Sequence, residues 1–526
     1  MSLDAAHAAL RQHGADPRVA RFGRWAGALA FAALLLWPGL GLEPLQRRTA
    51  AVTALTAILW LTSAIPLGAA SLVPVALLPL LGVLPARDAA AVYFNDIVML
   101  FFAASIVASG LEHWGVHRRM ALAVVDAVGT RPRALVLGFT AATAFISLWI
   151  NNTAATLLMY PIGLAVITTL SAERAGAFPV ALLLGIAYGS SIGGVATPVG
   201  TAPNNILLGT LGELYPQAPT ISFGSWVAAW LPFAALYVVA LWLLLTRLCL
   251  RVHDGELAAG EVVKRERAGL GRMSPGEKRM SFVFVLTAVL WVTREGLEMG
   301  AFSLPGWGRQ LAQWQADGVV GASVQSLGKH VSDATVALAV AVACFLVPSG
   351  EGRGVRLLDW DAVQRRMPWD VLLLFGGGFC LARGFEASGL DRALGHALSP
   401  LLAGLPSFAV VLAVAAFMTL FSELASNTVL TNLMLPVLAQ MAVQGGMDPR
   451  FLMMPATIAA SLGFMLPVAT PPNAIVFSSG RIPMGTMLRV GLWIDLVGVL
   501  LVALVFETWG RWVLGIGMQL PDWARP

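Results

Sequence analysis

Long apolar segments recur along this chain from about residue 25 to its C-terminus. Many are close to 20 residues long, which is the length an α-helix needs to cross roughly 30 Å of hydrocarbon. Charged residues make up only 12% of the 526 residues, about half the share that is typical of a soluble domain. We therefore expect an all-α polytopic membrane protein whose main partner is the lipid bilayer.

The charge balance is mildly basic, with 34 Lys and Arg against 29 Asp and Glu. Cytoplasmic loops of membrane proteins collect Lys and Arg, and the loop at 247–279 is the richest in them. A nucleic-acid-binding surface would need a basic face with interleaved aromatic residues. The sequence shows no such pattern, so we expect no nucleic-acid partner.

Some of the apolar stretches are interrupted by polar residues and prolines, and we interpret these as two re-entrant hairpins and two broken helices. The sequence then predicts about eleven transmembrane helices plus the two hairpins, with a cytoplasmic N-terminus and the C-terminus outside. The plain spans are 25–43, 51–68, 70–86, 95–112, 225–248, 281–297, 333–348, 369–387 and 487–510; the hairpins are 134–170 and 405–441, and the broken helices 179–212 and 452–479.

The interrupted segments form an internal repeat. NNTAATLLMYPI at 151–162 matches SNTVLTNLMLPV at 426–437, and 199–204 matches 468–473. Ordered Asn, Thr and Pro matches indicate duplication, because chance similarity between apolar segments gives only Leu, Ala and Val matches. The two halves have opposite orientations in the predicted topology, which is typical of transporters. Matched pairs upstream are Asp96 with Asp370, Gly110 with Gly384, Glu112 with Glu386, and Gly115 with Gly389.

A helix break at membrane depth is tolerated only where it lines a cavity or is buried in protein. The oxygen atoms that a break frees suit a small hard cation, whereas its N–H groups and the positive helix end favour an anion. Neither hairpin tip holds a Lys or Arg, and Glu423 is the one ionisable residue near a tip. The charge of a bound anion would therefore be offset by co-bound cations, and a dianion needs two monovalent ones.

At these residues the chain resembles the divalent anion:sodium symporter (DASS) family, whose hallmark is Ser-Asn-Thr at the tip of each of two opposed hairpins. The second tip here is Ser426-Asn427-Thr428, and the first is Asn151-Asn152-Thr153, with Asn where the family usually has Ser. FMLPVATPPNAIVF at 464–477 and GSSIGGVATPVGTAPN at 189–204 also resemble family signatures.

The resemblance implies sodium-coupled symport of C4-dicarboxylates such as succinate, malate and fumarate, with Na+ as the co-transported ion and no organic cofactor. It also implies a homodimer in the bacterial inner (plasma) membrane, with scaffold domains and elevator-type transport domains. The implied first sodium site is Ser147, Asn151, Asn152 and Gly200, and the second is Ser422, Ala425, Asn427 and Ala469. The implied substrate-binding residues are Asn151, Asn152, Thr153, Thr201, Ser426, Asn427, Thr428 and Pro471.

These expectations divide the chain into consecutive units. A cytoplasmic tail at 1–24 precedes scaffold helices at 25–130, the first transport-domain repeat at 131–250 and a cytoplasmic loop at 251–280. Scaffold helices at 281–400, the second transport-domain repeat at 401–515 and a tail at 516–526 follow.

Several alternatives stay open at this point. The carrier could be a sodium-independent dicarboxylate exchanger, a proton-coupled carrier, or a symporter of citrate or sulfate. An enzyme is not expected, because no nucleophile–base or metal constellation is visible. For His113 and His117, and for Gly376 to Gly378, we favour structural roles over a metal site and a phosphate-binding loop, respectively.

Overall fold

The computed structural model describes residues 17–37, 41–129, 131–168, 176–253, 259–299, 302–308, 310, 331–352, 354–402 and 404–525. The described chain is mostly helical, as predicted. Its first helix begins at Pro17, within the predicted N-terminal tail. Residues 1–16 and much of the predicted 298–332 loop lie outside the described residues.

The first helices build one side of the molecule. They are α2 (Pro17–Leu36), α3 (Pro44–Leu61), α4 (Leu67–Ala70), α5 (Val73–Leu80), α6 (Ala86–Ala91) and η2 (Val92–Phe94). The continuous span predicted at 70–86 is wrong, because helix α5 covers only Val73–Leu80 of it and α6 does not begin until Ala86. Pro66 precedes α4, Pro74 lies in the first turn of α5, and Pro79 lies near its end. Proline removes a backbone donor and clashes with the preceding turn, which explains the interruption.

Two matching helix pairs reflect the internal repeat. Helix α7 (Asp96–His113) leads into α8 (Val116–Val128), and α21 (Trp369–Ser388) leads into α22 (Leu390–Leu398). The matched glycines Gly115 and Gly389 join the members of each pair with φ of 69° and 70°. A side chain strains this left-handed conformation, which explains glycine at both positions.

The hairpins and broken helices follow each pair in the same order. The first repeat has α9 (Pro132–Ser147), α10 (Asn152–Thr168), α12 (Phe178–Gly194) and α13 (Ala202–Leu214), and the second has α23 (Ser407–Ser422), α24 (Asn427–Gln444), α25 (Arg450–Ala460) and α26 (Pro471–Phe477). The helix ends fall at the predicted polar interruptions. Helices α14 (Phe223–Leu243) and α27 (Met484–Val505) close the repeats, each followed by a short π-helix, η3 (Leu244–Cys249) and η5 (Phe506–Gly510).

The remaining elements connect and cover these units. They are α15 (Ala259–Gly269), α16 (Pro275–Val292), α19 (Asp333–Leu346), α20 (Trp360–Arg366), η4 (Ser399–Leu402), α28 (Arg511–Val513) and η6 (Asp522–Ala524). One departure from the all-α expectation is an antiparallel pair of strands, β1 (Gly296–Met299) and β2 (Phe302–Pro305). Helix α16 accordingly ends at Val292, before the predicted end of its span at 297.

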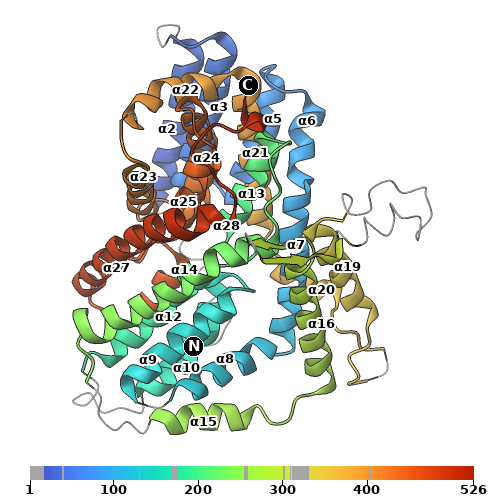
Figure 1. The fold of residues 1–526 in the computed structure, drawn as a ribbon, viewed down its shortest axis with the longest axis vertical. Coiled ribbons are helices and arrows are strands. Elements are labelled where there is room, and N and C mark those ends of the chain that lie inside the picture. The colour runs from blue at the N-terminus through green and yellow to red at the C-terminus, as the bar shows by residue number, and fades with distance from the viewer. Residues whose placement is uncertain are drawn as a thin grey trace.

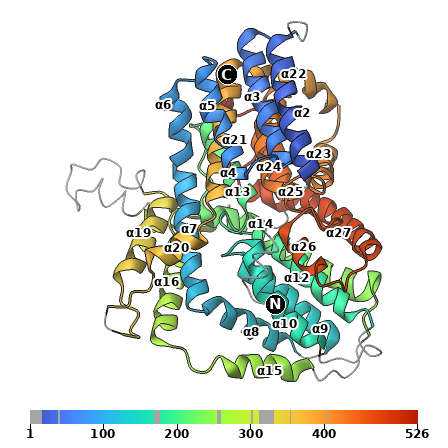
Figure 2. The ribbon, with the colours of Figure 1, turned by 180° about the vertical axis from the view of Figure 1, so that it is seen from behind.

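The two hairpins occupy different halves of the molecule. Helices α9 and α10 lie in the lower part of Figure 1, and α23 and α24 lie in the upper part. The broken helices lie between them, and the view from behind shows α26 beside α12 (Figure 2). Helix α10 packs against α26, and α24 packs against α13, so each hairpin contacts the broken helix of the other repeat.

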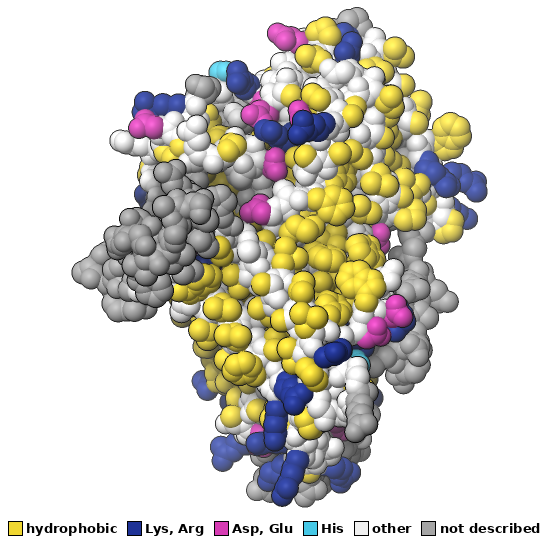
Figure 3. Space-filling view, turned by 90° about the vertical axis from the view of Figure 1, so that its right-hand side faces the viewer, with side chains coloured by type: hydrophobic (Ala, Val, Ile, Leu, Met, Phe, Trp, Pro, Cys, Tyr) yellow, Lys and Arg dark blue, Asp and Glu magenta, His cyan; other side chains and the backbone are white. Residues whose placement is uncertain are grey.

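The outer surface suits a lipid environment. Large apolar side chains on α16 and α27 are more than half exposed, among them Phe282, Val285, Trp493 and Leu496. A broad hydrophobic surface crosses the middle of one side, and Lys and Arg side chains gather at its lower end (Figure 3). Five helices within the described residues are long and apolar enough to cross a membrane. Burial of these faces in hydrocarbon accounts for their exposure.

Candidate functional site

The first hairpin tip is held by side-chain hydrogen bonds. Ser147 Oγ donates to Asn152 Oδ1 at 2.7 Å, and these residues end α9 and begin α10. Asn151 is exposed, and its Oδ1 accepts from the backbone N–H of Ala154 at 2.9 Å. Asn151 therefore caps α10, a task that the shorter Ser side chain also performs at helix N-termini.

The break between α12 and α13 is organised by two asparagine amides. Asn204 Nδ2 donates to the carbonyls of Gly194, Val195 and Thr197 at 3.1, 3.3 and 2.7 Å. Asn205 Nδ2 donates to Pro198 O at 2.7 Å. Both side chains are fully buried. Buried carbonyls that a helix break frees need such partners, and this need explains the Pro-Asn pattern at the start of α13.

Oxygen atoms from the first tip and the first break converge on a small volume. A Cβ atom placed on Gly200 would lie 2.5 Å from Gly194 O and 2.7 Å from Ser147 O. A Cβ atom on Gly194 would lie 2.4 Å from Asn152 Oδ1 and 3.2 Å from Gly200 O. Three of the four residues predicted for the first sodium site are thus neighbours, whereas the side chain of the fourth, Asn151, is used in the helix cap.

The second break repeats this construction. Asn473 Nδ2 donates to Gly463 O and Leu466 O, each at 3.0 Å. These two carbonyls correspond in the repeat to those of Gly194 and Thr197, which Asn204 holds. The Oδ1 atoms of Asn204 and Asn473 are both buried without a hydrogen-bond partner. The duplication therefore extends to individual hydrogen bonds.

The second hairpin tip lies against this break. A Cβ atom on Gly463 would lie 3.2 Å from Ser422 Oγ, 3.4 Å from Ser422 O and 3.2 Å from the Ala469 side chain. Ala425 is half-buried in the tip, and Asn427 Oδ1 is buried without a partner. The residues predicted for the second sodium site thus come from the tip of α23–α24 and the facing break.

The residues predicted for the substrate lie on adjoining helices. Asn152 and Thr153 are half-buried at the start of α10, and α10 packs against α26, whose first residue, Pro471, is exposed. Half-buried Asn427 and Thr428 begin α24, which packs against α13, and Thr201 immediately precedes α13. Ser426 is exposed at the second tip.

Two buried carboxyl groups near the second tip were not among the predicted site residues. Glu423 Oε1 and Oε2 accept from the backbone N–H groups of Met465 and Leu466, each at 2.8 Å. Asp495 lies on α27 and is 4% exposed. A carboxylate within an apolar span is expensive and usually functional, and this rule applied to 487–510 would have identified Asp495.

The two tips are not equivalent. In the first repeat, Thr197 Oγ1 donates to Leu148 O at 2.5 Å, which joins the tip to the break through neutral groups. In the second repeat, Glu423 occupies the position of Leu148 and joins the same parts through its carboxylate. The second tip therefore places a negative charge beside its break, and the first does not.

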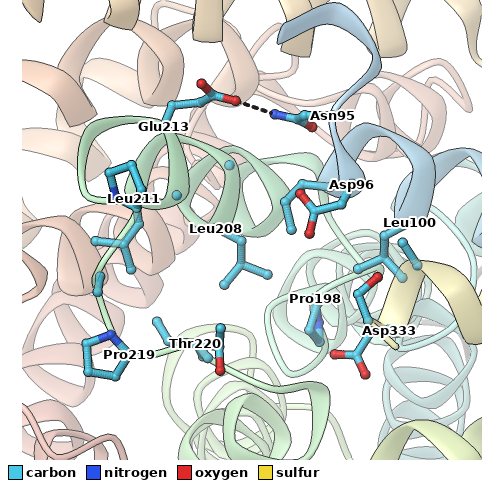
Figure 4. Close-up of a pocket in the computed structure, with 18 of the residues that line it drawn as sticks. Asn95, Asp96, Leu100, Pro198, Leu208, Leu211, Glu213, Pro219, Thr220 and Asp333 are labelled. Carbon is cyan, nitrogen blue, oxygen red and sulfur yellow. Dashed lines mark hydrogen bonds between the residues drawn. The ribbon is translucent and has the colours of Figure 1, made fainter. Parts of the chain in front are cut away.

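A cavity of about 560 Å³ opens next to the first break. Figure 4 shows Asp96, Leu208, Pro198 and Asp333 around it. At its rim, Asn95 Nδ2 donates to Glu213 Oε1 at 3.0 Å. The cavity reaches the break at Pro198 but is lined by none of the predicted tip residues.

Two motifs that we interpreted as structural make the following contacts. A Cβ atom on Gly376 would lie 2.2 Å from the Tyr93 ring, and one on Gly378 would lie 1.9 Å from Asn432 Oδ1, so these glycines allow close helix packing. The ring of His117 bonds Leu111 O through Nδ1 at 2.9 Å. Burial lowers the pKa of His117 to about 4. Within the described residues, no group of His, Cys, Asp and Glu could hold a metal ion.

Duplicated hairpins facing broken helices, with oxygen clusters at both tips, define an integral membrane protein of the secondary-transporter class. A family model described as "Sodium:sulfate symporter transmembrane region" matches residues 25–516. The chain therefore belongs to this family, the divalent anion:sodium symporters whose tip motifs it resembles.

Relatives of known name span nearly the whole chain. The rat Na(+)/citrate cotransporter is 36% identical, and the alignment covers 94% of this chain and 96% of the relative. The sodium-dependent dicarboxylate transporter SdcS of Staphylococcus saprophyticus is 36% identical over 90% of this chain and 87% of its own. Human Na(+)/dicarboxylate cotransporter 3 is 33% identical, and the alignment covers 94% of this chain and 93% of the relative.

Solved structures share the fold at low sequence identity. The Neisseria gonorrhoeae MtrF structure, from a class of antimetabolite efflux pumps, has a TM-score of 0.55 and 13% identity and covers 82% of this chain and 83% of its own. The Alcanivorax borkumensis YdaH transporter has a TM-score of 0.52 and 14% identity, and it covers 80% of this chain and 86% of its own. These likenesses concern the fold alone.

Proposed function

We propose that this protein is a secondary active transporter that carries small dicarboxylates of the C4 class, such as succinate, malate and fumarate, together with sodium. The observation that carries the proposal is the pair of oxygen clusters, one around Ser147 and Gly200 and the other around Ser422 and Gly463. Carbonyl, hydroxyl and amide oxygens are the ligands that a small hard cation prefers.

Electrostatics explains why cation and anion would bind together. The residues proposed for the substrate carry no positive side chain, so a dianion between the tips would face only neutral groups and helix ends. Sodium ions at the two clusters would supply the missing positive charge, because charges interact strongly where water is excluded. Coupling then follows, since neither partner binds well without the other.

We further propose that the transport domain, with both hairpins and both broken helices, moves against the scaffold as an elevator within a homodimer. Gly209 on α13, in the proposed transport domain, lies close to the ring of Phe379 on α21, in the proposed scaffold. A residue without a side chain at this contact supports sliding of one domain past the other. We place the protein in the bacterial inner membrane with a cytoplasmic N-terminus, because the basic 247–279 loop then faces the cytoplasm.

Uptake of labelled succinate into proteoliposomes tests the proposal. An inward sodium gradient should drive accumulation, and replacement of external sodium by choline should abolish it. Uptake that persists without sodium and depends on internal dicarboxylate would show an exchanger instead, and uptake driven by a pH gradient alone would show proton coupling.

Citrate is the second candidate substrate, favoured by the similarity to the rat Na(+)/citrate cotransporter over nearly the whole chain. Competition identifies the preferred anion. Unlabelled succinate, citrate and sulfate are compared as inhibitors of sodium-driven uptake of labelled succinate. Stronger inhibition by citrate than by succinate would make citrate the preferred anion. Stronger inhibition by sulfate than by succinate would make sulfate the preferred anion.

A further inference from the structure

Four buried polar side chains meet behind the second hairpin tip. Tyr188 on α12 and Tyr237 on α14 are 0% exposed, and Glu423 at the tip and Asp495 on α27 are 2% and 4% exposed. Helix α27 packs against both α23 and α14, and α14 packs against α12. Tyr188 and Glu423 bond the consecutive residues Phe464 and Met465, and Tyr237 bonds Ile494, which directly precedes Asp495. The carboxyl groups of Glu423 and Asp495 lie next to each other.

The hydrogen-bond donors around this cluster are directed away from Asp495. Tyr188 Oη donates to Phe464 O at 2.7 Å, and Tyr237 Oη donates to Ile494 O at 2.7 Å. Glu423 uses its two oxygens to accept from the Met465 and Leu466 N–H groups. Both carboxyl oxygens of Asp495 are buried and accept no hydrogen bond from a tyrosine hydroxyl, and the neighbour within hydrogen-bonding reach is the Glu423 carboxyl.

Among the described residues, no Lys or Arg forms an ion pair with Glu423 or Asp495. Within the part of the chain that the structure describes, the ion pairs of Lys and Arg involve other carboxylates, such as Arg450 with Asp448 and Arg294 with Asp333. Removal of a charge from water without a partner is far more unfavourable than its burial in a pair. Two neighbouring buried carboxyl groups therefore need a compensating cation, either a metal ion or a proton.

The cluster offers the ligands for such a cation. Asp495 offers two buried carboxyl oxygens, and each phenol oxygen that donates its proton to a carbonyl keeps lone pairs that can face an ion. Carboxylate and hydroxyl oxygens are hard ligands that suit a small hard cation. The set uses none of the residues predicted for the first two sodium sites.

We propose that Asp495, Glu423, Tyr188 and Tyr237 form a third sodium site, separate from the two sites at the hairpin tips. The proposal rests on the proposed sodium-coupled function. Because Glu423 also holds the N–H groups of Met465 and Leu466, an ion beside it would stabilise the break that borders the second site.

Equilibrium binding of labelled sodium to the purified full-length protein, in saturating succinate, tests the site. Asp495→Asn keeps the side-chain shape and removes the charge, so we expect one fewer sodium ion bound per protomer than in the wild type. Gly200→Ala, which crowds the first cluster, should instead bind one of its ions about 5- to 150-fold more weakly, and the double variant should show both changes.

Tyr237→Phe gives a second test that leaves the carboxylates in place. It removes one phenol oxygen while keeping the ring, so sodium should bind several-fold more weakly with an unchanged number of ions. Tyr215→Phe is the matched control, because Tyr215 lies outside the cluster, where its hydroxyl pairs with Gln440 at 3.4 Å. Unchanged affinity in Tyr237→Phe would remove that residue from the site.

The outcomes separate this site from the proposed function. If Asp495→Asn binds as many sodium ions as the wild type, the third site is refuted and the cluster holds a proton or water instead, while the proposed symport stands. A wild-type protein that binds no sodium would overturn both.

Discussion

Replacement of Gly200 by alanine should weaken sodium coupling, because the added methyl group enters the first oxygen cluster. Its Cβ would lie 2.5 Å from Gly194 O and 2.7 Å from Ser147 O, closer than real Cβ contacts come. Overpacking of a tight site costs about 1–3 kcal/mol. If that strain falls on the sodium-bound form, the half-saturating sodium concentration rises by about 5- to 150-fold, at 1.4 kcal/mol per factor of ten.

The assay is the sodium dependence of succinate uptake in proteoliposomes at a fixed, low succinate concentration. Gly212→Ala is the matched control, since Gly212 lies on α13 and a Cβ atom there meets nothing within 4 Å. Size-exclusion profiles and thermal unfolding confirm that both variants are folded. A Gly200→Ala protein with the sodium dependence of Gly212→Ala would refute the placement of a sodium ion at this cluster.

Three further substitutions follow from the same geometry. Asn204→Ala should destabilise the protein by about 1–3 kcal/mol for each buried carbonyl left unpaired, and a Tm loss no greater than that of an exposed substitution would contradict the role of its amide. Asn427→Ala should abolish uptake with little change in Tm, because its buried Oδ1 has no hydrogen-bond partner to lose; robust uptake would exclude Asn427 from the site. Gly209→Ala, whose Cβ would lie 2.0 Å from the Phe379 ring, should block uptake but keep stabilisation by sodium, and normal uptake would argue against movement along α21.

The repeat and its breaks could be predicted from sequence because their physical causes are local. A Pro-Asn pair after an apolar run ends one helix and starts another, and the freed carbonyls then need a donor. The amides of Asn204 and Asn473 supply it in both halves. The left-handed turns at Gly115 and Gly389 are likewise local, and their pairing was visible in the sequence.

Other features depend on tertiary packing and could not be predicted in this way. Glu423 and Asp495 are separated by many residues, and only the packing of α27 against α23 makes them neighbours. The short length of α5 is a different case, because its prolines, Pro74 and Pro79, are a local cause that hydropathy does not register. The span predicted at 281–297 overlaps β1 only at its first two residues, and the rest of the β1–β2 pair follows the predicted span.

The difference between the two tips bears on how the chain tolerates mutation. Leu148 joins its tip to the facing break through a backbone carbonyl, which every residue type provides. Glu423 makes the corresponding connection through its side chain, so a substitution there removes the connection itself. For this contact, position 148 therefore needs only its backbone, whereas position 423 needs a side chain that can accept two hydrogen bonds.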